Sequence, residues 1–212
     1  ETKSRDAYDH DVYVVRSDSK GLLVWEKMIG GAGSDYAWSV QQTRDGGFIL
    51  AGGTESYGAG SYDVYLIKMD GAGNVIWEKT YGGAASDSAY AVLQLAGGGY
   101  LIAGNTESFG AGDPDVYLLK TDSEGEIIWQ KTYGGSGSDY GWSLLDALDG
   151  GYIIAGEKEV AGEQGGRFAA YLLKVDPEGN KMWENTYGYN SASSFYGAAP
   201  AGGVGGRRSL GG

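Results

Sequence analysis

The chain has 212 residues, a formal net charge of −12 and no cysteine. The charge argues against binding to the phosphate backbone of nucleic acids, which needs clustered lysine and arginine, and the missing thiol excludes disulfides, thiolate catalysis and thiolate metal sites. Forty glycines, 17 tyrosines, six tryptophans and three prolines indicate a turn-rich, aromatic β protein.

One phrase recurs along the whole chain. It first appears as SDSKGLLVWEK around Trp25, and similar phrases surround Trp77, Trp129 and Trp183, at spacings of 52, 52 and 54 residues. Such a period predicts a tandem array in which neighbouring copies bury each other's apolar faces. We therefore expect a single domain, residues 1–212. Its expected segments are a half unit 1–29, full units 30–81, 82–133 and 134–187, and a glycine-rich closing half unit 188–212.

Each full unit predicts four short strands bounded by glycine, aspartate or serine. In the unit that starts at residue 82, the strands are expected at 89–95, 99–105, 115–122 and 126–135. The turns Asp45-Gly46-Gly47 and Asp149-Gly150-Gly151 indicate a hairpin between the first two strands, because Asp-Gly supplies the positive φ of tight turns. A second turn, residues 122–125, indicates a hairpin between the last two strands.

The predicted strands are apolar on both sides, so each small sheet needs cover on both faces. Four antiparallel strands in about 50 residues, repeated, are typical of a β-propeller, whereas a sandwich needs no repetition and a β-helix has a shorter period. The predicted fold is therefore all-β, a β-propeller of four-stranded blades. We expect four blades, one of them split between the two ends of the chain.

The two ends of the chain support the split blade. Residues 2–11 align with residues 106–115, so the chain begins just after the second strand of a unit, and the tail aligns with the first two strands. Joining the ends would hide open sheet edges. However, Pro200 falls in an expected inner strand, where it lacks a ladder donor. A tail that pairs poorly, pairs in another register or ends a longer array remains an alternative.

Two known repeat families resemble these units. The phrase Asp-x-x-Gly-x-x-x-Trp, as in Asp70, Gly73 and Trp77, resembles the tryptophan-docking repeats of quinoprotein-type propellers, although it lacks their extra residue before the glycine. YGGxxSDxxY/W, GGYxIAG and DVYLxKxD resemble the generic β-propeller repeats of large bacterial and archaeal surface or secreted proteins, over about residues 12–187. This resemblance implies an extracellular or cell-envelope location and a binding or structural role.

The recurrent tryptophans Trp25, Trp77, Trp129 and Trp183 are expected to hold the blades together. Exposed copies would instead suit sugar binding. Tyrosines in the GSDY and GTESY phrases offer a similar choice between a stacking platform for saccharides and ordinary sheet packing, and packing is the favoured interpretation.

Six acidic residues recur in loops that a meander places at the same end of every blade. They are Asp35, Asp87 and Asp139 before the first strand, and Glu55, Glu107 and Glu159 after the second. Together they predict an acidic contact face, and a ring of carboxylates could accept Ca²⁺. The alternative is that aspartate and serine turn the chain by bonding nearby backbone amides. We favour that alternative over a metal site, because no D-x-D-x-D-G loop is present.

Nothing in the sequence points to catalysis. His10 is the only histidine, and neither a G-x-S-x-G elbow nor a phosphate-binding P-loop occurs. We therefore predict no catalytic residues, no cofactor and no enzyme activity. A carboxylate pair for glycoside cleavage stays open, because its separation depends on the fold.

Three functions follow from these observations. The first is a non-enzymatic secreted or cell-surface scaffold that binds a protein or glycan through its acidic, loop-bearing face. The second is a structural protein that polymerises head to tail through the split blade, because heterologous contacts that do not close give filaments. The third is a carbohydrate-binding or glycan-active propeller. We expect no membrane span, since no run of 18 apolar residues occurs.

Overall fold

Over residues 10–160 and 167–188, which the computed structural model describes, the chain forms 14 β-strands and no helix. The all-β prediction is confirmed. Every strand pairs antiparallel with a neighbour in sequence, so each connection is a hairpin or a loop to the next sheet. Within the same residues, no helix is long and apolar enough to cross a membrane.

The strands form one two-stranded and three four-stranded sheets. The half-sheet consists of β1 (Val12–Ser17) and β2 (Leu23–Ile29). The first sheet consists of β3 (Asp35–Gln42), β4 (Phe48–Thr54), β5 (Asp63–Met69) and β6 (Val75–Tyr81). The second sheet consists of β7 (Asp87–Gln94), β8 (Tyr100–Thr106), β9 (Asp115–Thr121) and β10 (Ile127–Tyr133). The third sheet consists of β11 (Asp139–Asp146), β12 (Tyr152–Val160), β13 (Arg167–Val175) and β14 (Lys181–Tyr187).

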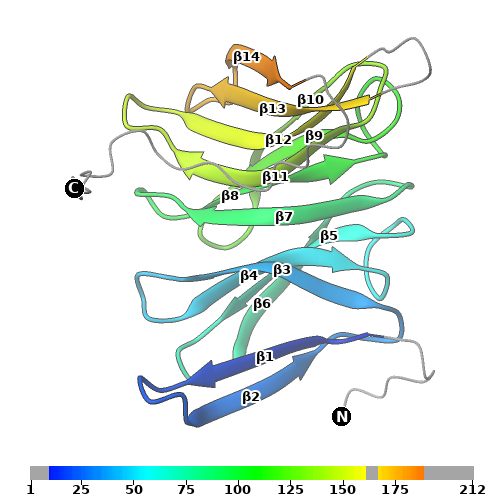
Figure 1. Cartoon of the computed structure of the whole chain (residues 1–212). Helices are drawn as coiled ribbons and strands as arrows, with labels where there is room; N and C mark the ends of the chain where they lie inside the picture. The colour runs from blue at the N-terminus through cyan, green and yellow to red at the C-terminus, as the bar shows by residue number, and fades with distance from the viewer. Residues whose placement is uncertain (1–9, 161–166, 189–212) are drawn as a thin grey trace, which may run out of the picture.

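The sheets follow one another in chain order, with the half-sheet at one end of the stack and the third sheet at the other (Figure 1). Each sheet lies inside one of the segments expected from the repeat. No strand of the half-sheet pairs with the third sheet, so the described sheets do not close into a ring. The predicted closing strands fall in residues 189–212, outside the described residues.

Glycine turns join the first two strands of each sheet. Gly46 has a φ of 82°, and Gly150 and Gly151 have φ values of 93° and 75°. These are left-handed conformations that glycine adopts without the steric cost of a Cβ. The predicted hairpins therefore form, and they leave the last residue of one strand next to the first residue of the other.

Each inner strand contributes to two interfaces, as β5 shows. Val64 and Leu66 join a buried cluster with the second sheet. Tyr65 and Ile67, which alternate with them, join a cluster with the half-sheet. Because side chains alternate between the two faces of a strand, an unbroken apolar sequence covers both faces at once.

The recurrent tryptophans connect each sheet to the next one. Trp25 lies against the turn at Gly73 of the first sheet, and its Nε1 donates a hydrogen bond of 3.3 Å to the carbonyl of Gly71. A Cβ added to Gly73 would lie 2.9 Å from the Trp25 ring. The rings of Trp77 and Trp129 lie in the same way against the turn glycines Gly125 and Gly179, respectively.

All of these turns have one construction. An aspartate carboxylate accepts the N–H groups two and four residues later: Asp70 accepts those of Ala72 and Asn74, each at 2.8 Å. The glycine that receives the ring has a positive φ, 81° at Gly73. Glycine is therefore required twice, by its backbone conformation and by the ring that lies on it.

Trp183 is the exception among the four tryptophans. It lies on β14 at the end of the stack, and 39% of its surface is exposed. Conversely, the turn of the half-sheet at Gly21 has a φ of 78°, yet no heavy atom of the described residues approaches within 4 Å of an added Cβ. The two ends thus carry one tryptophan without a turn and one turn without a tryptophan.

We predict that Trp77→Ala lowers the free energy of unfolding by about 3–5 kcal/mol, because it opens a cavity between the first and second sheets. The measurement is chemical denaturation followed by circular dichroism. Trp183→Ala is the matched control, which changes the equivalent ring at the uncovered end of the described stack, and its loss should be clearly smaller than that of Trp77→Ala. A parent-like transition for Trp77→Ala would contradict the packing role.

A second comparison separates backbone strain from ring contact. Gly73→Ala and Gly21→Ala both place a Cβ at a left-handed φ, which costs about 1–2 kcal/mol in each variant. Only at Gly73 does the Cβ also meet a tryptophan ring. The same denaturation assay should therefore show the larger loss for Gly73→Ala, and equal losses would argue against the ring contact.

Candidate functional site

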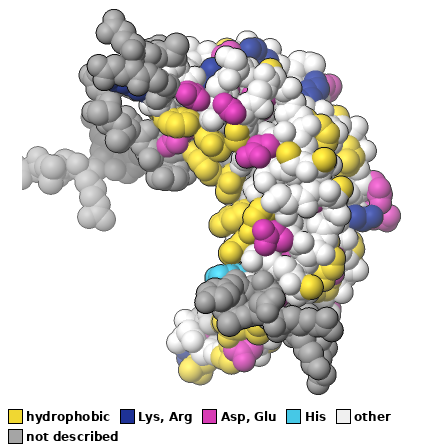
Figure 2. Space-filling model, turned by 90° about the vertical axis from the view of Figure 1, so that its right-hand side faces the viewer, with side chains coloured by type: hydrophobic (Ala, Val, Ile, Leu, Met, Phe, Trp, Pro, Cys, Tyr) yellow, Lys and Arg dark blue, Asp and Glu magenta, His cyan; other side chains and the backbone are white. Residues whose placement is uncertain are grey.

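One side of the array is hollowed and carries hydrophobic side chains together with carboxylates (Figure 2). The strands β3, β7 and β11 lie on this side, each at the edge of its own sheet and next to the corresponding strand of the neighbouring sheet. Side chains from three sheets therefore meet along one line.

Five aromatic residues on these three strands form a continuous row. Trp38 stacks on Tyr36 with ring centroids 5.6 Å apart and lies 5.1 Å from Tyr90. Tyr90 lies 4.5 Å from Trp142, which stacks on Tyr140 at 5.1 Å. These separations are those of favourable aromatic pairs. We call Tyr36, Trp38, Tyr90, Trp142 and Tyr140 the aromatic row.

The aromatic row is only partly covered. Trp38 has 47% of its surface exposed, and the other four members are half-buried. Further rings lie at its margins: His10 and Tyr62 next to Tyr36, and Phe168 next to Tyr140. The row therefore offers ring surface to a ligand while its members hold one another in place.

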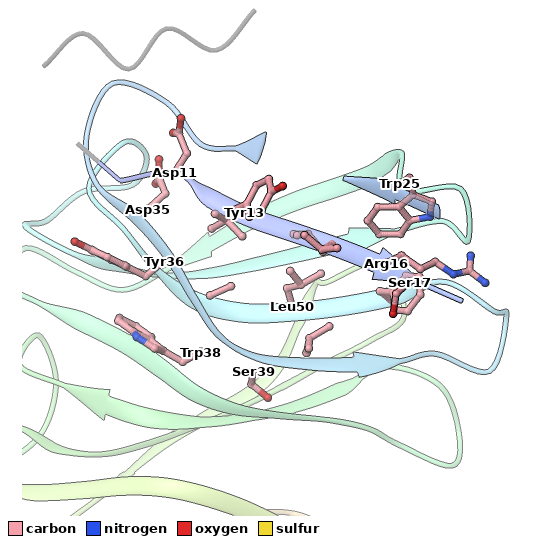
Figure 3. Close-up of a pocket in the computed structure, with 16 residues that line it drawn as sticks. Asp11, Tyr13, Arg16, Ser17, Trp25, Asp35, Tyr36, Trp38, Ser39 and Leu50 are labelled. Atoms are coloured by element: carbon pink, nitrogen blue, oxygen red, sulfur yellow. The ribbon is translucent and has the colours of Figure 1, made fainter. Parts of the chain in front are cut away.

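A pocket of about 540 Å³ adjoins the start of the aromatic row (Figure 3). Tyr36 and Trp38 on β3 line one side, and Val12 and Val14 on β1 line the other. In every four-stranded sheet the equivalent of β1 pairs on two edges, whereas β1 pairs only with β2 among the described strands. The pocket thus lies beside an open strand edge.

The predicted acidic aspartates are buried and do not reach the surface. The Asp35 carboxylate accepts hydrogen bonds from the hydroxyls of Thr54 and Ser56, the latter at 2.6 Å, and from the N–H of Gly31 at 2.8 Å. Asp87 has the same three kinds of donor, supplied by Thr106, Ser108 and Gly83. These two carboxylates tie the loop before the first strand to the loop after the second, which is the structural alternative weighed in the sequence.

Asp139 departs from this arrangement. It keeps the N–H of Gly135 at 2.8 Å, but Lys158 and Val160 occupy the positions of the threonine and the serine. The Lys158 ammonium lies 3.9 Å from the carboxylate. Burial raises the pKa of Asp139 to about 6, against the opposing effect of the Lys158 charge.

The three glutamates lie closer to solvent than the aspartates. Glu55 and Glu107 are exposed and Glu159 is half-buried. The backbone N–H of each bonds a serine carbonyl of the preceding loop, as Glu55 does with Ser34 at 2.9 Å. Burial and the nearby Glu55 carboxylate raise the pKa of Tyr62 to about 12, so an acidic group adjoins the aromatic row.

The structure therefore separates the six predicted acidic residues into two sets. The three aspartates are buried, and Asp35 and Asp87 fasten loops, whereas Glu55 and Glu107 are exposed at the loop-bearing end and Glu159 is half-buried. No three histidine or acidic side chains in the described part of the chain are grouped so that they could hold a metal ion. His10 is exposed.

The sequence analysis named the GSDY tyrosines, Tyr36 and Tyr140, as candidates for a stacking platform, but it missed the row that they form with Trp38, Tyr90 and Trp142. Trp38, Tyr90 and Trp142 recur at intervals of 52 residues, and Tyr36 and Tyr140 precede two of them by two residues. Residues i and i+2 share one face of a strand. This alternation, on the first strand of every repeat, is the signal that could have found the row.

No known protein-family model matches this chain, and comparison with curated proteins finds no match.

We predict a pH-dependent gain in stability for Asp139→Asn. The folded protein favours the neutral form of Asp139, because its pKa is raised from 3.8 to about 6. The parent therefore loses stability relative to the variant as pH rises through this interval, and the difference should level off above pH 7 or so. Thermal melts from pH 4 to pH 8 measure it.

Asp87→Asn serves as the control, because the Asp87 carboxylate has three donors and its replacement should destabilise the protein at neutral pH. Lys158→Thr combined with Val160→Ser, which supplies the two missing hydroxyls, should remove the pH effect. A difference between Asp139→Asn and the parent that stays constant with pH would contradict the assignment.

Proposed function

We propose that this protein is a non-enzymatic binding scaffold of the β-propeller type, in which the aromatic row and the neighbouring glutamates contact a partner. The observation that carries the proposal is the continuity of the row across three sheets, with Trp38 nearly half exposed. Side chains needed only for packing inside one sheet have no reason to align across three.

The chemistry of this surface favours a basic polypeptide segment. Aromatic faces attract lysine and arginine side chains by cation–π interaction, at about 0.5–1 kcal/mol per exposed contact. Glu55 and Glu107 are exposed at the loop-bearing end, and the whole chain carries a net charge of −12. A field of one sign also speeds the encounter with a partner of the opposite sign.

The propeller architecture and the location belong to the same proposal. Four-stranded antiparallel sheets that repeat and cover each other's faces support an open arc of propeller blades. The resemblance to surface-protein repeats supports a secreted or cell-envelope site of action. The proposal assigns no cofactor and no catalytic residue.

Carbohydrate binding is the second candidate function. The same row favours it, because the apolar faces of sugar rings also stack on exposed tryptophan and tyrosine. A neutral glycan would bind without the salt dependence expected of a basic peptide.

The test titrates the protein with a panel of lysine- and arginine-rich peptides and, separately, with neutral oligosaccharides, using calorimetry and tryptophan fluorescence. We expect peptide binding that weakens with salt, and we expect Trp38→Ala to lower the affinity about tenfold, equivalent to about 1.4 kcal/mol. Trp38→Phe should retain most of the affinity.

Trp183→Ala is the matched control, because Trp183 lies on β14 and outside the row. Binding of oligosaccharides alone would favour the second candidate. Binding of neither class, or equal affinity for the parent and Trp38→Ala, would reject the aromatic row as the contact surface.

A further inference from the structure

Three times within the chain, the tryptophan of one sheet packs on the turn of the next. The outer face of the third sheet carries the same kind of side chains that form these interfaces. Trp183 and Tyr187 on β14 have 39% and 52% of their surfaces exposed. Beside them, Leu145, Leu148 and Ile153 contribute to a groove of about 330 Å³ that Trp183 also lines. The equivalent face of the second sheet is covered by the third sheet.

The outer face of the half-sheet lacks the preceding sheet that covers the equivalent face of the first sheet. Tyr13 and Val15 on β1 have 59% and 52% of their surfaces exposed. Their equivalents 52 residues later, Tyr65 and Ile67, are each 1% exposed because the half-sheet packs on them. The half-sheet therefore presents the surface on which the other sheets receive a preceding neighbour.

The turn that would receive a tryptophan is already formed on the half-sheet. Asp18 accepts the N–H groups of Lys20 at 2.8 Å and Leu22 at 2.9 Å, as Asp70 does in the first sheet. Gly21 has a φ of 78°, close to the 81° of Gly73. Because no heavy atom in the described part of the chain lies within 4 Å of an added Cβ on Gly21, the position that would receive a ring is open there.

A polar contact that occurs in two of the three internal interfaces also has its donor present on the third sheet. Four residues after the docked tryptophan, Tyr81 donates its hydroxyl to the carbonyl of Gly125 at 2.7 Å. Tyr133 does the same with Gly179 at 2.5 Å. Tyr187 stands four residues after Trp183, so docking on the half-sheet would bring its hydroxyl to the carbonyl of Gly21.

The half-sheet and the third sheet of one chain lie at opposite ends of the stack (Figure 1). Their two surfaces are complementary but cannot meet within the described arrangement. We propose that they meet between copies: the third sheet of one chain docks on the half-sheet of a second copy, with Trp183 over the Asp18–Gly21 turn. No member of the aromatic row lies on either of these two faces, so the inference does not depend on the proposed partner.

The contact is heterologous, since each copy uses a different end. After two chains join, the complex still has one free half-sheet and one free third sheet, so association continues head to tail into a chain or a ring of copies. This route differs from strand exchange through the tail, because it needs only the faces of described sheets.

The test is sedimentation velocity over a series of protein concentrations. The parent should form dimers and larger species as concentration rises. Trp183→Ala removes the docking ring, and Gly21→Asn fills the seat with a residue that tolerates a left-handed φ. Each substitution should weaken association by about tenfold or more, as expected for a central aromatic anchor.

Mixing the two variants gives the decisive result. Trp183→Ala retains an intact half-sheet and Gly21→Asn retains an intact third sheet, so the mixture should form one-to-one heterodimers that grow no further. Thermal melts confirm that both variants fold. Trp38→Ala, on the hollowed side, is the matched control and should associate like the parent.

A parent that sediments as a single monomer at its highest soluble concentration would overturn the inference. Association that is unchanged in Trp183→Ala or in Gly21→Asn would overturn it as well, as would a mixture that forms polymers. If Trp38→Ala alone abolished association, the aromatic row would be the self-association surface, and the proposed docking of sheet ends would be wrong.

Discussion

The packing of an indole ring on a left-handed glycine is the contact on which this architecture depends. None of the sheets can bury both of its apolar faces alone, and the tryptophan of one sheet reaches over the edge to the turn of the next. The turn accepts the ring because an aspartate holds its backbone in place and a glycine leaves the space. One short phrase therefore encodes both the end of a hairpin and the position of its neighbour.

This mode of stacking explains where the functional surfaces lie. The faces between neighbouring sheets are buried by packing. The exposed parts of the array are therefore strand edges, loops and the two terminal faces. The first strand of each sheet lies at an edge, and its aromatic side chains line up with those of the neighbouring sheets into the aromatic row. Glu55 and Glu107 are exposed in the loops after the second strands, and Glu55 adjoins the row through Tyr62.

Much of the fold could be predicted from the sequence, because the period and the turn glycines are local signals. The strands of the second sheet begin and end within a few residues of the expected ranges. Closure into a ring could not be predicted in the same way, since it depends on how each sheet is inclined to the next. The sequence carries a signal for the burial of Asp35 and Asp87, because a threonine 19 residues later and a serine 21 residues later recur with each of them.

Asp139 shows that equivalent residues of a repeat can have different electrostatic surroundings. Its surroundings differ from those of its equivalents at two positions that carry no turn signal, and those positions alone change its chemistry. A repeat therefore predicts shared geometry better than shared electrostatics, which must be judged from the partners of each copy.

The stack also implies a gradient of local stability along the chain. The second sheet is covered on both faces, whereas the half-sheet has two strands and a single neighbour among the described residues. Energies in such arrays are set by nearest-neighbour contacts. Local unfolding should therefore start at the ends of the stack and move inward. Backbone amide hydrogens should exchange with solvent soonest in β1 and β2 and slowest in the strands of the second sheet.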